Sequence, residues 1–203
     1  MDAIDRDGEL MLRYGCGDVA AFEKLYERHK GALYRYLLRQ VRDPVLASDL
    51  FQEVWSRVIA VRNRYEARAK FATFLFHIAH HCTIDQHRRR RTAAAAGGFD
   101  PDGPPPPEAE GPEHERPDRI AEYGEQRSAL LAALAQLPPE QREAFLLREE
   151  GGLGVEEIAR ITHVGVETAK SRLRYAVRKL RSALAETDSN AAHQPLVTRL
   201  RPL

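Results

Sequence analysis

A segment that cannot form a packed core divides this chain into two parts. From Thr92 to about Asp118 the sequence holds seven of the chain's 12 prolines, four glycines and a series of acidic side chains. Such a composition buries too little apolar surface to offset the entropy lost on ordering. The sequence therefore predicts two compact regions joined by a flexible, Pro/Gly-rich linker at residues 93–118. The polar end of the chain, residues 186–203, is expected to be a loose tail.

Apolar residues recur at helical spacing on both sides of this linker. Asp18 is suited to cap a long helix, and Asp43 followed by Pro44 is typical of the start of another. A further helix is expected from about Phe71 to a run of four arginines ending at Arg91. Beyond the linker, a leucine-rich helix, a helix at residues 140–150 and two later helices are expected. The predicted fold is all-α, with two small helical domains at residues 10–92 and 119–185.

The stretch from Gly154 to Leu184 shows two apolar helical repeats separated by a short interruption at residues 161–165. The second repeat carries six Lys and Arg side chains after Glu167 and no acidic residue among them. A helical hairpin with a solvated basic face is one interpretation. The turn, the apolar seam and the basic bias together favour a helix-turn-helix, whose second helix enters the major groove. Its candidate DNA contacts are Thr168, Lys170, Ser171, Arg172, Arg174 and Tyr175.

A second basic region lies between residues 61 and 91. Helical periodicity lapses over Arg62, Asn63, Arg64 and Tyr65, and the helix that follows ends in the four arginines. Cations interleaved with aromatic rings suit single-stranded nucleic acid, because bases stack on rings while cations follow the backbone. A structural helix whose basic last turn complements its own dipole is the alternative.

Overall composition excludes several classes of protein. The net charge of +1 gives no global attraction to nucleic acid, so any attraction depends on local segregation of charge. The chain has only two cysteines, Cys16 and Cys82, and they lie far apart in sequence. This argues against a disulfide framework and fits a reducing compartment. The sequence has no apolar run of membrane-spanning length and begins with an acidic stretch. We expect a cytoplasmic protein without membrane insertion.

Several motifs occur in a set order on both sides of the linker. In the first part they are Gly17-Asp18-Val19-Ala20-Ala21-Phe22, Asp49-Leu50-Phe51-Gln52-Glu53 with Trp55, and Phe71 to Arg89. In the second they are Leu137-Pro138, Gln141-Arg142, Phe145-Leu146-Leu147, Glu157-Ile158-Ala159 and Thr168-Ala169-Lys170-Ser171-Arg172-Leu173. Their order and spacing resemble those of bacterial RNA polymerase sigma factors, in the extracytoplasmic-function (ECF) group of the sigma-70 superfamily, over nearly the whole chain except the linker and the tail.

The resemblance implies a sigma-2-like domain at 10–92, a sigma-4-like domain at 119–185, and a role for each surface. Docking on core polymerase, at the clamp of the largest subunit and the flap, would involve Asp49, Leu50, Gln52 and Glu53. Recognition and melting of the minus-10 element would involve Arg62, Asn63, Arg64, Tyr65, Lys70, His77, His81 and Arg88. The minus-35 element would be read by the helix-turn-helix residues above together with Arg178. The resemblance implies transcription initiation without catalysis or a cofactor.

Two positions depart from the family pattern just before the expected core-binding helix. Leu46 and Ser48 stand where acidic residues are usual in the family. Core binding is therefore expected to be weak by default, and phosphorylation of Ser48 would restore about −1.5 to −2 charges. A Ser/Thr kinase or an anti-sigma factor is accordingly expected as a regulatory partner.

Two other functions remain open at the level of sequence. The chain would be a stand-alone transcriptional regulator if the helix-turn-helix bound duplex DNA without polymerase. A metal site is the other alternative, since His77 and His81 have the i, i+4 spacing of helical ligands, with His80, Cys82 and His87 nearby. No glutamate completes a metalloprotease motif there. The sequence therefore favours a protein without a metal site.

Overall fold

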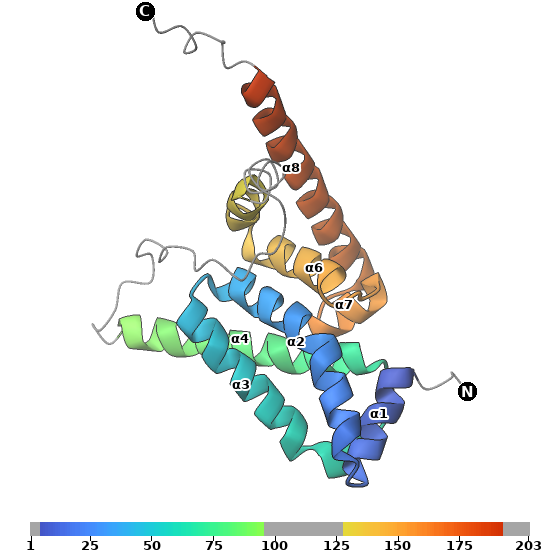
Figure 1. Ribbon diagram of the computed structural model, residues 1–203. Coiled ribbons are helices and arrows are strands. Elements are labelled where there is room, and N and C mark those ends of the chain that lie inside the picture. Colours follow the sequence, from blue (N-terminus) through green and yellow to red (C-terminus); the bar gives the residue numbers. More distant parts are fainter. Residues whose placement is uncertain (1–4, 96–127, 193–203) are drawn as a thin grey trace, which may run out of the picture.

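The computed structural model describes residues 5–95 and 128–192, which are helical and contain no strand. The first part comprises α1 (Arg6–Gly15), α2 (Val19–Val41), α3 (Pro44–Ala60), the 3-10 turn η1 (Arg62–Arg64) and α4 (Phe71–Ala95). The second comprises a helix at residues 128–135, α6 (Pro139–Glu149), α7 (Val155–Ile161) and α8 (Val166–Ala192) (Figure 1). The predicted all-α class is confirmed. None of these helices has the length and hydropathy needed to cross a bilayer.

The predicted helix starts follow from local capping. The Asp18 carboxylate accepts a hydrogen bond from the Ala21 N–H at 3.2 Å, so α2 begins directly after it. The Asp43 carboxylate accepts from Val45 N–H and from the next amide at 3.0 and 3.1 Å, and Pro44 occupies the first helical position. These side chains satisfy amides that the helix itself leaves without a partner.

Helix α1 was not predicted from the sequence. Asp5 caps it by accepting from the Gly8 N–H, and the other oxygen of Asp5 accepts from Phe71 N–H, at the start of α4, at 3.1 Å. Leu10 and Met11 are buried against α2. The Asp5 carboxylate thus joins the start of α1 to the start of α4, although the two helices are far apart in sequence.

The ends of two helices differ from the predicted domain limits. α8 continues to Ala192, so the tail predicted to be loose from residue 186 is helical in its first part. α4 likewise continues to Ala95, past the predicted start of the linker. Residues 96–118 of the predicted linker and residues 193–203 of the predicted tail lie outside the described residues.

The first domain packs α1 to α4 around one aromatic-rich core. Trp55 meets the rings of Phe22 and Tyr26, with centroids at 5.6 and 5.1 Å. Leu50 lies in this core and is only 2% exposed. The predicted contact of this side chain with polymerase stays a prediction, and it would require Leu50 to leave the domain's own interior. Its neighbours on the polar face of α3 remain available.

The two domains lie against each other. α6 packs on α2 and α7 packs on α4, whereas α8 extends well beyond the other helices (Figure 1). Buried residues of α6 and α7 belong to the same continuous core as those of the first domain. A smaller second core joins Leu134 and Leu137 to Ala176 and Leu180 of α8. We call the contact of α6 and α7 with α2 and α4 the docked arrangement.

Candidate nucleic-acid interface

The helix-turn-helix is formed by α7, a short turn and α8. At the end of α7 His163 takes a positive φ of 53°, and Val164 N–H donates to the carbonyl of Ala159 at 3.0 Å. This pattern closes a helix with a left-handed residue after its cap. At the start of α7 the Gly154 N–H donates to the Glu157 carboxylate at 2.7 Å. Glu157 thus satisfies one amide at the end that lacks a hydroxyl cap.

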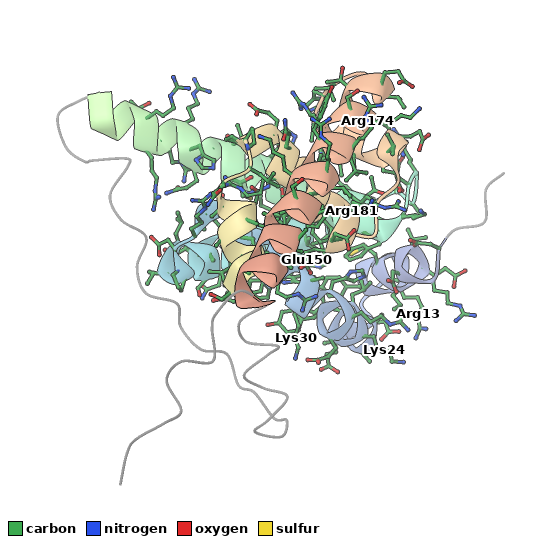
Figure 2. The ribbon with its side chains drawn as sticks, turned by 90° about the horizontal axis from the view of Figure 1, so that it is seen from above. Arg13, Lys24, Lys30, Glu150, Arg174 and Arg181 are labelled. Atoms are coloured by element: carbon green, nitrogen blue, oxygen red, sulfur yellow. The ribbon has the colours of Figure 1, made fainter. Side chains whose placement is uncertain are left out.

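The predicted recognition residues lie along α8, largely in solvent (Figure 2). Thr168, Lys170, Arg174, Tyr175 and Arg178 are exposed, while Ser171 and Arg172 are half-buried. The guanidinium carbons of Arg174 and Arg178 lie 5.4 and 4.9 Å from the centre of the Tyr175 ring. Cation–π contact with one ring orients both charges outward. The structure therefore brings the predicted basic residues together on one exposed helix.

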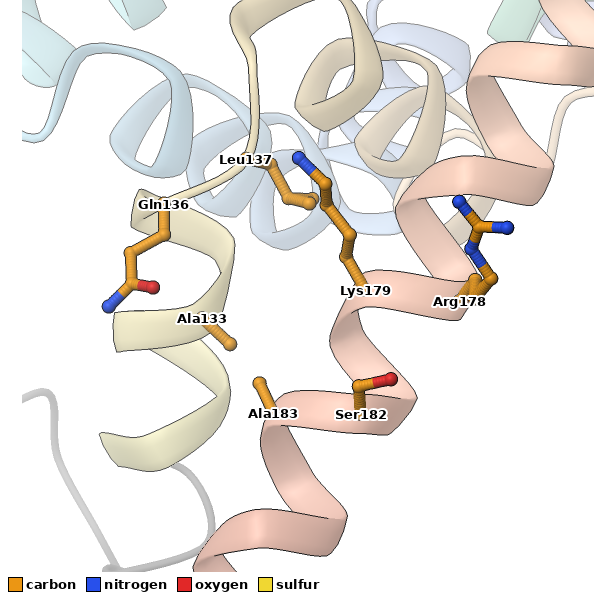
Figure 3. Close-up of a pocket in the computed structure, with 7 residues that line it drawn as sticks. All are labelled: Ala133, Gln136, Leu137, Arg178, Lys179, Ser182 and Ala183. Carbon is orange, nitrogen blue, oxygen red and sulfur yellow. The ribbon is translucent and has the colours of Figure 1, made fainter.

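A pocket of about 340 Å³ lies where the helix at residues 128–135 meets α8 (Figure 3). It is lined by Ala133, Gln136, Leu137, Arg178, Lys179, Ser182 and Ala183. This lining has no carboxylate, imidazole or thiol, so it lacks the side chains that usually bind metal ions. Arg178 borders both this pocket and the basic face of α8.

The predicted minus-10 residues before α4 gather around η1. Asn63 and Arg64 are exposed, and the Arg62 guanidinium donates to the Ile59 carbonyl at 3.1 Å. The Tyr65 ring packs edge-on against Phe74, with centroids 5.0 Å apart, and burial raises the pKa of its hydroxyl to about 12. Tyr65 would have to leave this contact before a base could stack on its face.

The other predicted minus-10 residues, Lys70 just before α4 and His77 and His81 within it, meet the second domain, whereas Arg88 of α4 is exposed. Lys70 Nζ lies 3.4 Å from the Glu157 carboxylate. The rings of His77 and His81 have centroids 6.2 and 5.9 Å from that of His163 in the helix-turn-helix turn. The docked arrangement therefore covers part of the surface that the sequence assigned to minus-10 DNA.

Glutamates of the second domain hold the docked arrangement, a role that the sequence predicted for none of them. Glu143 accepts from His80 and, at 3.4 Å, from the Tyr36 hydroxyl. Glu150 accepts from Arg39 and, at 2.9 Å, from Arg35. In sequence these carboxylates look like solvent-exposed helix residues, so no local signal would have found them.

Glu157 is the third of these carboxylates. It accepts from the Thr73 hydroxyl of α4 at 2.8 Å, in addition to Gly154 and Lys70. Burial raises the pKa of Glu157, but the two hydrogen bonds and the charge of Lys70 outweigh it, and the pKa lies below its ordinary value. The carboxylate is therefore ionised while it joins the two domains.

The predicted core-binding face lies on α3. Asp49 and Gln52 are exposed, and Glu53 pairs with Arg57 of the same helix at 2.5 Å. Ser48 is half-buried and donates its hydroxyl hydrogen to the Pro44 carbonyl at 2.9 Å. Apart from buried Leu50, the predicted residues share an accessible polar surface.

The fold and this site define a helix-turn-helix DNA-binding protein with a second helical domain that carries its own basic region. The Sigma-70 region 2 family matches residues 25–93, and the Sigma-70 region 4 family matches residues 127–180. The chain is 33% identical to RNA polymerase sigma factor CarQ of Myxococcus xanthus, over 90% of this chain and 99% of that protein. It is 31% identical to ECF RNA polymerase sigma factor SigX of Bacillus subtilis, over 81% and 86%. The chain belongs to the ECF sigma factors of RNA polymerase.

Two solved structures share the fold. One is sigma factor RpoE in complex with anti-sigma factor NepR from Bartonella quintana, with a TM-score of 0.65 at 22% identity over 81% of this chain and 96% of that one. The other is CnrH in complex with the cytosolic domain of CnrY, with a TM-score of 0.62 at 22% identity over 91% and 99%. Because both sigma-70 regions are present, a stand-alone regulator is not favoured.

Proposed function

We propose that this sigma factor binds core RNA polymerase in the cytoplasm and directs it to promoters by dividing recognition between its two domains, with no catalytic activity of its own. The observation that carries the proposal is the exposed basic face of α8 in a chain that also contains sigma-70 region 2. The proposed domains are those expected from the sequence, residues 10–92 and 119–185, and helices α1, α4 and α8 continue past these limits. Joining them lets one protein hold two DNA elements at once, which raises the overall affinity.

The first experiment is run-off transcription from a pool of bacterial promoter fragments by purified core polymerase, with and without this protein. Transcripts that require the protein, with start sites that share two upstream elements, are the expected result. Absence of such transcripts, together with tight binding of the protein alone to duplex DNA, would contradict the proposal and revive the stand-alone regulator.

The minus-35 element would be read by α8. Lys170, Ser171, Arg174 and Tyr175 would lie nearest to base edges, and Thr168, Arg172 and Arg178 nearer to phosphates. Loss of one phosphate contact lowers the slope of log affinity against log salt by about 0.9. Arg178→Ala is therefore expected to lower the slope of holoenzyme binding by about this amount. Lys24→Ala, which removes an exposed charge from α2 (Figure 2), is the matched control.

The minus-10 element would be captured by η1 and α4. Because Lys70, His77 and His81 face the second domain in the docked arrangement, the domains would have to separate before α4 met DNA. Separation would also suit reading of two distant elements. Crosslinking the domains is expected to abolish promoter opening while leaving the protein folded.

Core polymerase would bind the polar face of α3, through Asp49, Gln52 and Glu53. Phosphorylation of Ser48 would add charge to this face. Ser48→Asp and kinase-treated protein should bind core more tightly than Ser48→Ala, as measured by competition with a labelled sigma factor. Equal affinity of all three would remove the phosphorylation proposal and leave core binding intact.

An anti-sigma factor is the other proposed regulator. The two solved relatives are described as complexes of RpoE with the anti-sigma factor NepR and of CnrH with CnrY. A cognate anti-sigma protein is expected to lower run-off transcription stoichiometrically. Its binding site is expected to include surfaces that polymerase or DNA also uses.

A further inference from the structure

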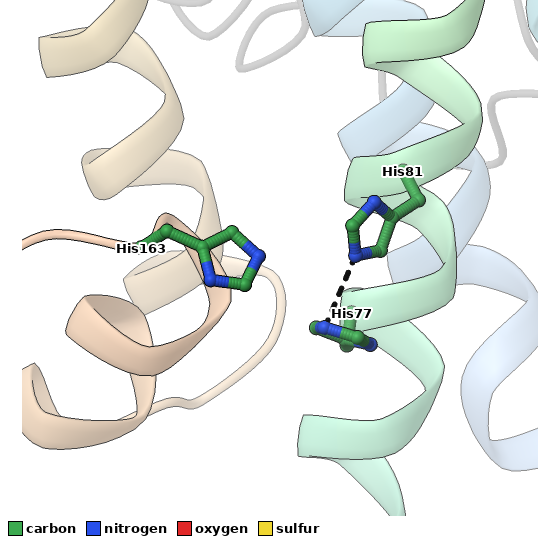
Figure 4. Close-up of side chains that lie close together, drawn as sticks. All are labelled: His77, His81 and His163. Atoms are coloured by element: carbon green, nitrogen blue, oxygen red, sulfur yellow. Dashed lines mark hydrogen bonds between the residues drawn. The ribbon is translucent and has the colours of Figure 1, made fainter.

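Three histidines from two domains converge in the docked arrangement (Figure 4). His77 and His81 lie one turn apart on α4, and their Nε2 atoms are 3.2 Å apart. His163 comes from the turn of the helix-turn-helix. One ring nitrogen from each residue lies within 4.8 Å of the other two. The sequence pointed to only two of these residues, because His163 is far from them along the chain.

The other metal candidates from the sequence point elsewhere. His80 is directed to Glu143, and Cys82 is buried in the core of the first domain. The sequence suggested histidines and a cysteine of one helix as ligands, whereas the structure brings together three imidazoles from two domains. Imidazole nitrogen suits Zn²⁺ and other borderline divalent metals.

The geometry is close to that of a metal site. Zn–N bonds of about 2.0–2.1 Å in a tetrahedral site place ligand nitrogens about 3.3 Å apart. The pair on α4 already meets this spacing, and the His163 nitrogen, within 4.8 Å of both, belongs to an exposed side chain that would have to approach by about 1.5 Å. Three protein ligands leave a fourth position for water.

His163 takes a positive φ after a helix cap, a position that glycine usually fills and that histidine adopts more readily than most other residues. Substitution by glycine at this position therefore removes the imidazole without straining the backbone.

We propose that His77, His81 and His163 bind a Zn²⁺ ion that fastens the helix-turn-helix turn to α4. The ion would stabilise the docked arrangement and keep the minus-10 residues of α4 covered. Zn²⁺ would thereby act as a negative regulator, released or removed before promoter opening. This consequence rests on the proposed sigma factor function, whereas the binding itself does not.

The first test titrates zinc chloride into the tag-free, full-length protein by calorimetry. One Zn²⁺ per chain is expected. His163→Gly removes the ligand and relieves the positive φ, so the variant stays folded, and its affinity should fall by at least about 100-fold, beyond the usual cost of losing an outer partner. His87→Ala, which removes an exposed histidine of the same helix, should bind as the wild type does.

The second test measures the distance between domains without polymerase or DNA. Fluorophores are placed on exposed Cys16 and on the cysteine introduced by Ser182→Cys, while Cys82 stays buried. Zn²⁺ should raise energy transfer in this protein and leave it unchanged when His163→Gly is added. Equal zinc affinity in wild type and His163→Gly, no binding at micromolar zinc, or binding without a change in transfer would each overturn the proposal.

Transcription separates this inference from the sigma factor function. The His163→Gly protein should support run-off transcription that zinc does not repress, whereas the wild type should be repressed. If both proteins were active and responded equally to zinc, the proposed zinc site would be overturned and the sigma factor function would stand. Inactivity of both would instead contradict the function, while the calorimetry would still decide the metal site.

Discussion

The hydrogen bond from Thr73 to Glu157 offers a measure of how firmly the two domains are held together. Thr73 is 7% exposed, and its hydroxyl donates to the carboxylate at 2.8 Å. A hydrogen bond to a charged group contributes about 1.5–3 kcal/mol. Thr73→Val keeps the shape of the side chain but removes the donor. Since Glu157 retains Gly154 N–H and Lys70, we expect a loss near the lower limit, about 1.5 kcal/mol, or roughly tenfold in the docking equilibrium.

The assay is energy transfer between labels on Cys16 and on the cysteine of Ser182→Cys, in metal-free buffer. Thr73→Val should shift the population toward separated domains, with the melting temperature of the first domain little changed. Thr92→Val makes the same substitution on the same helix, where the hydroxyl donates to the Arg88 carbonyl of its own helix, and should leave transfer unchanged. Equal transfer in wild type and both variants would refute the view that this carboxylate holds the domains together.

Three further predictions concern single side chains. Leu50→Ala should lower the free energy of unfolding by about 2–5 kcal/mol in chemical denaturation, because it leaves a cavity in the core. Asp49→Asn, on the exposed face of the same helix, should change this free energy by less than about 0.5 kcal/mol. A Leu50→Ala protein as stable as the wild type would contradict the burial of Leu50. A thiol reagent at neutral pH should modify exposed Cys16 in the native protein and reach Cys82 only on unfolding, since burial raises the pKa of Cys82 to about 11; similar rates at both would contradict this. Hydrogen bonds outweigh burial and lower the pKa of Glu157, so its contribution to docking is complete above pH 4.5 and is lost as the pH falls through the lowered pKa of the folded protein. Glu157→Gln should remove this part of the acid dependence of energy transfer. An acid profile that is the same in the variant and the wild type would contradict this role of Glu157.

Local chemistry explains why much of the fold was predictable. Asp18, Asp43 and Pro44 act within one turn of the helix starts that they mark. A short stretch of sequence is therefore enough to identify these starts. The same holds for the helix-turn-helix and for the exposed basic residues of α8, whose face is set by helical periodicity. Helix α1 was missed because its apolar pattern is short, and because its packing against α2 and the bond of Asp5 to the Phe71 amide involve residues beyond that pattern.

The sequence by itself determined most of the helices, the basic face of α8 and, through its motifs, the membership of this chain in the sigma factor family. Only the tertiary structure decided that Leu50 is interior, that Glu157 bridges two domains and that His163 meets His77 and His81. Helix caps and periodicity are properties of neighbouring residues. Docking depends on contacts between residues far apart in the chain, and each polar side chain involved looks in sequence like any other on a solvated helix.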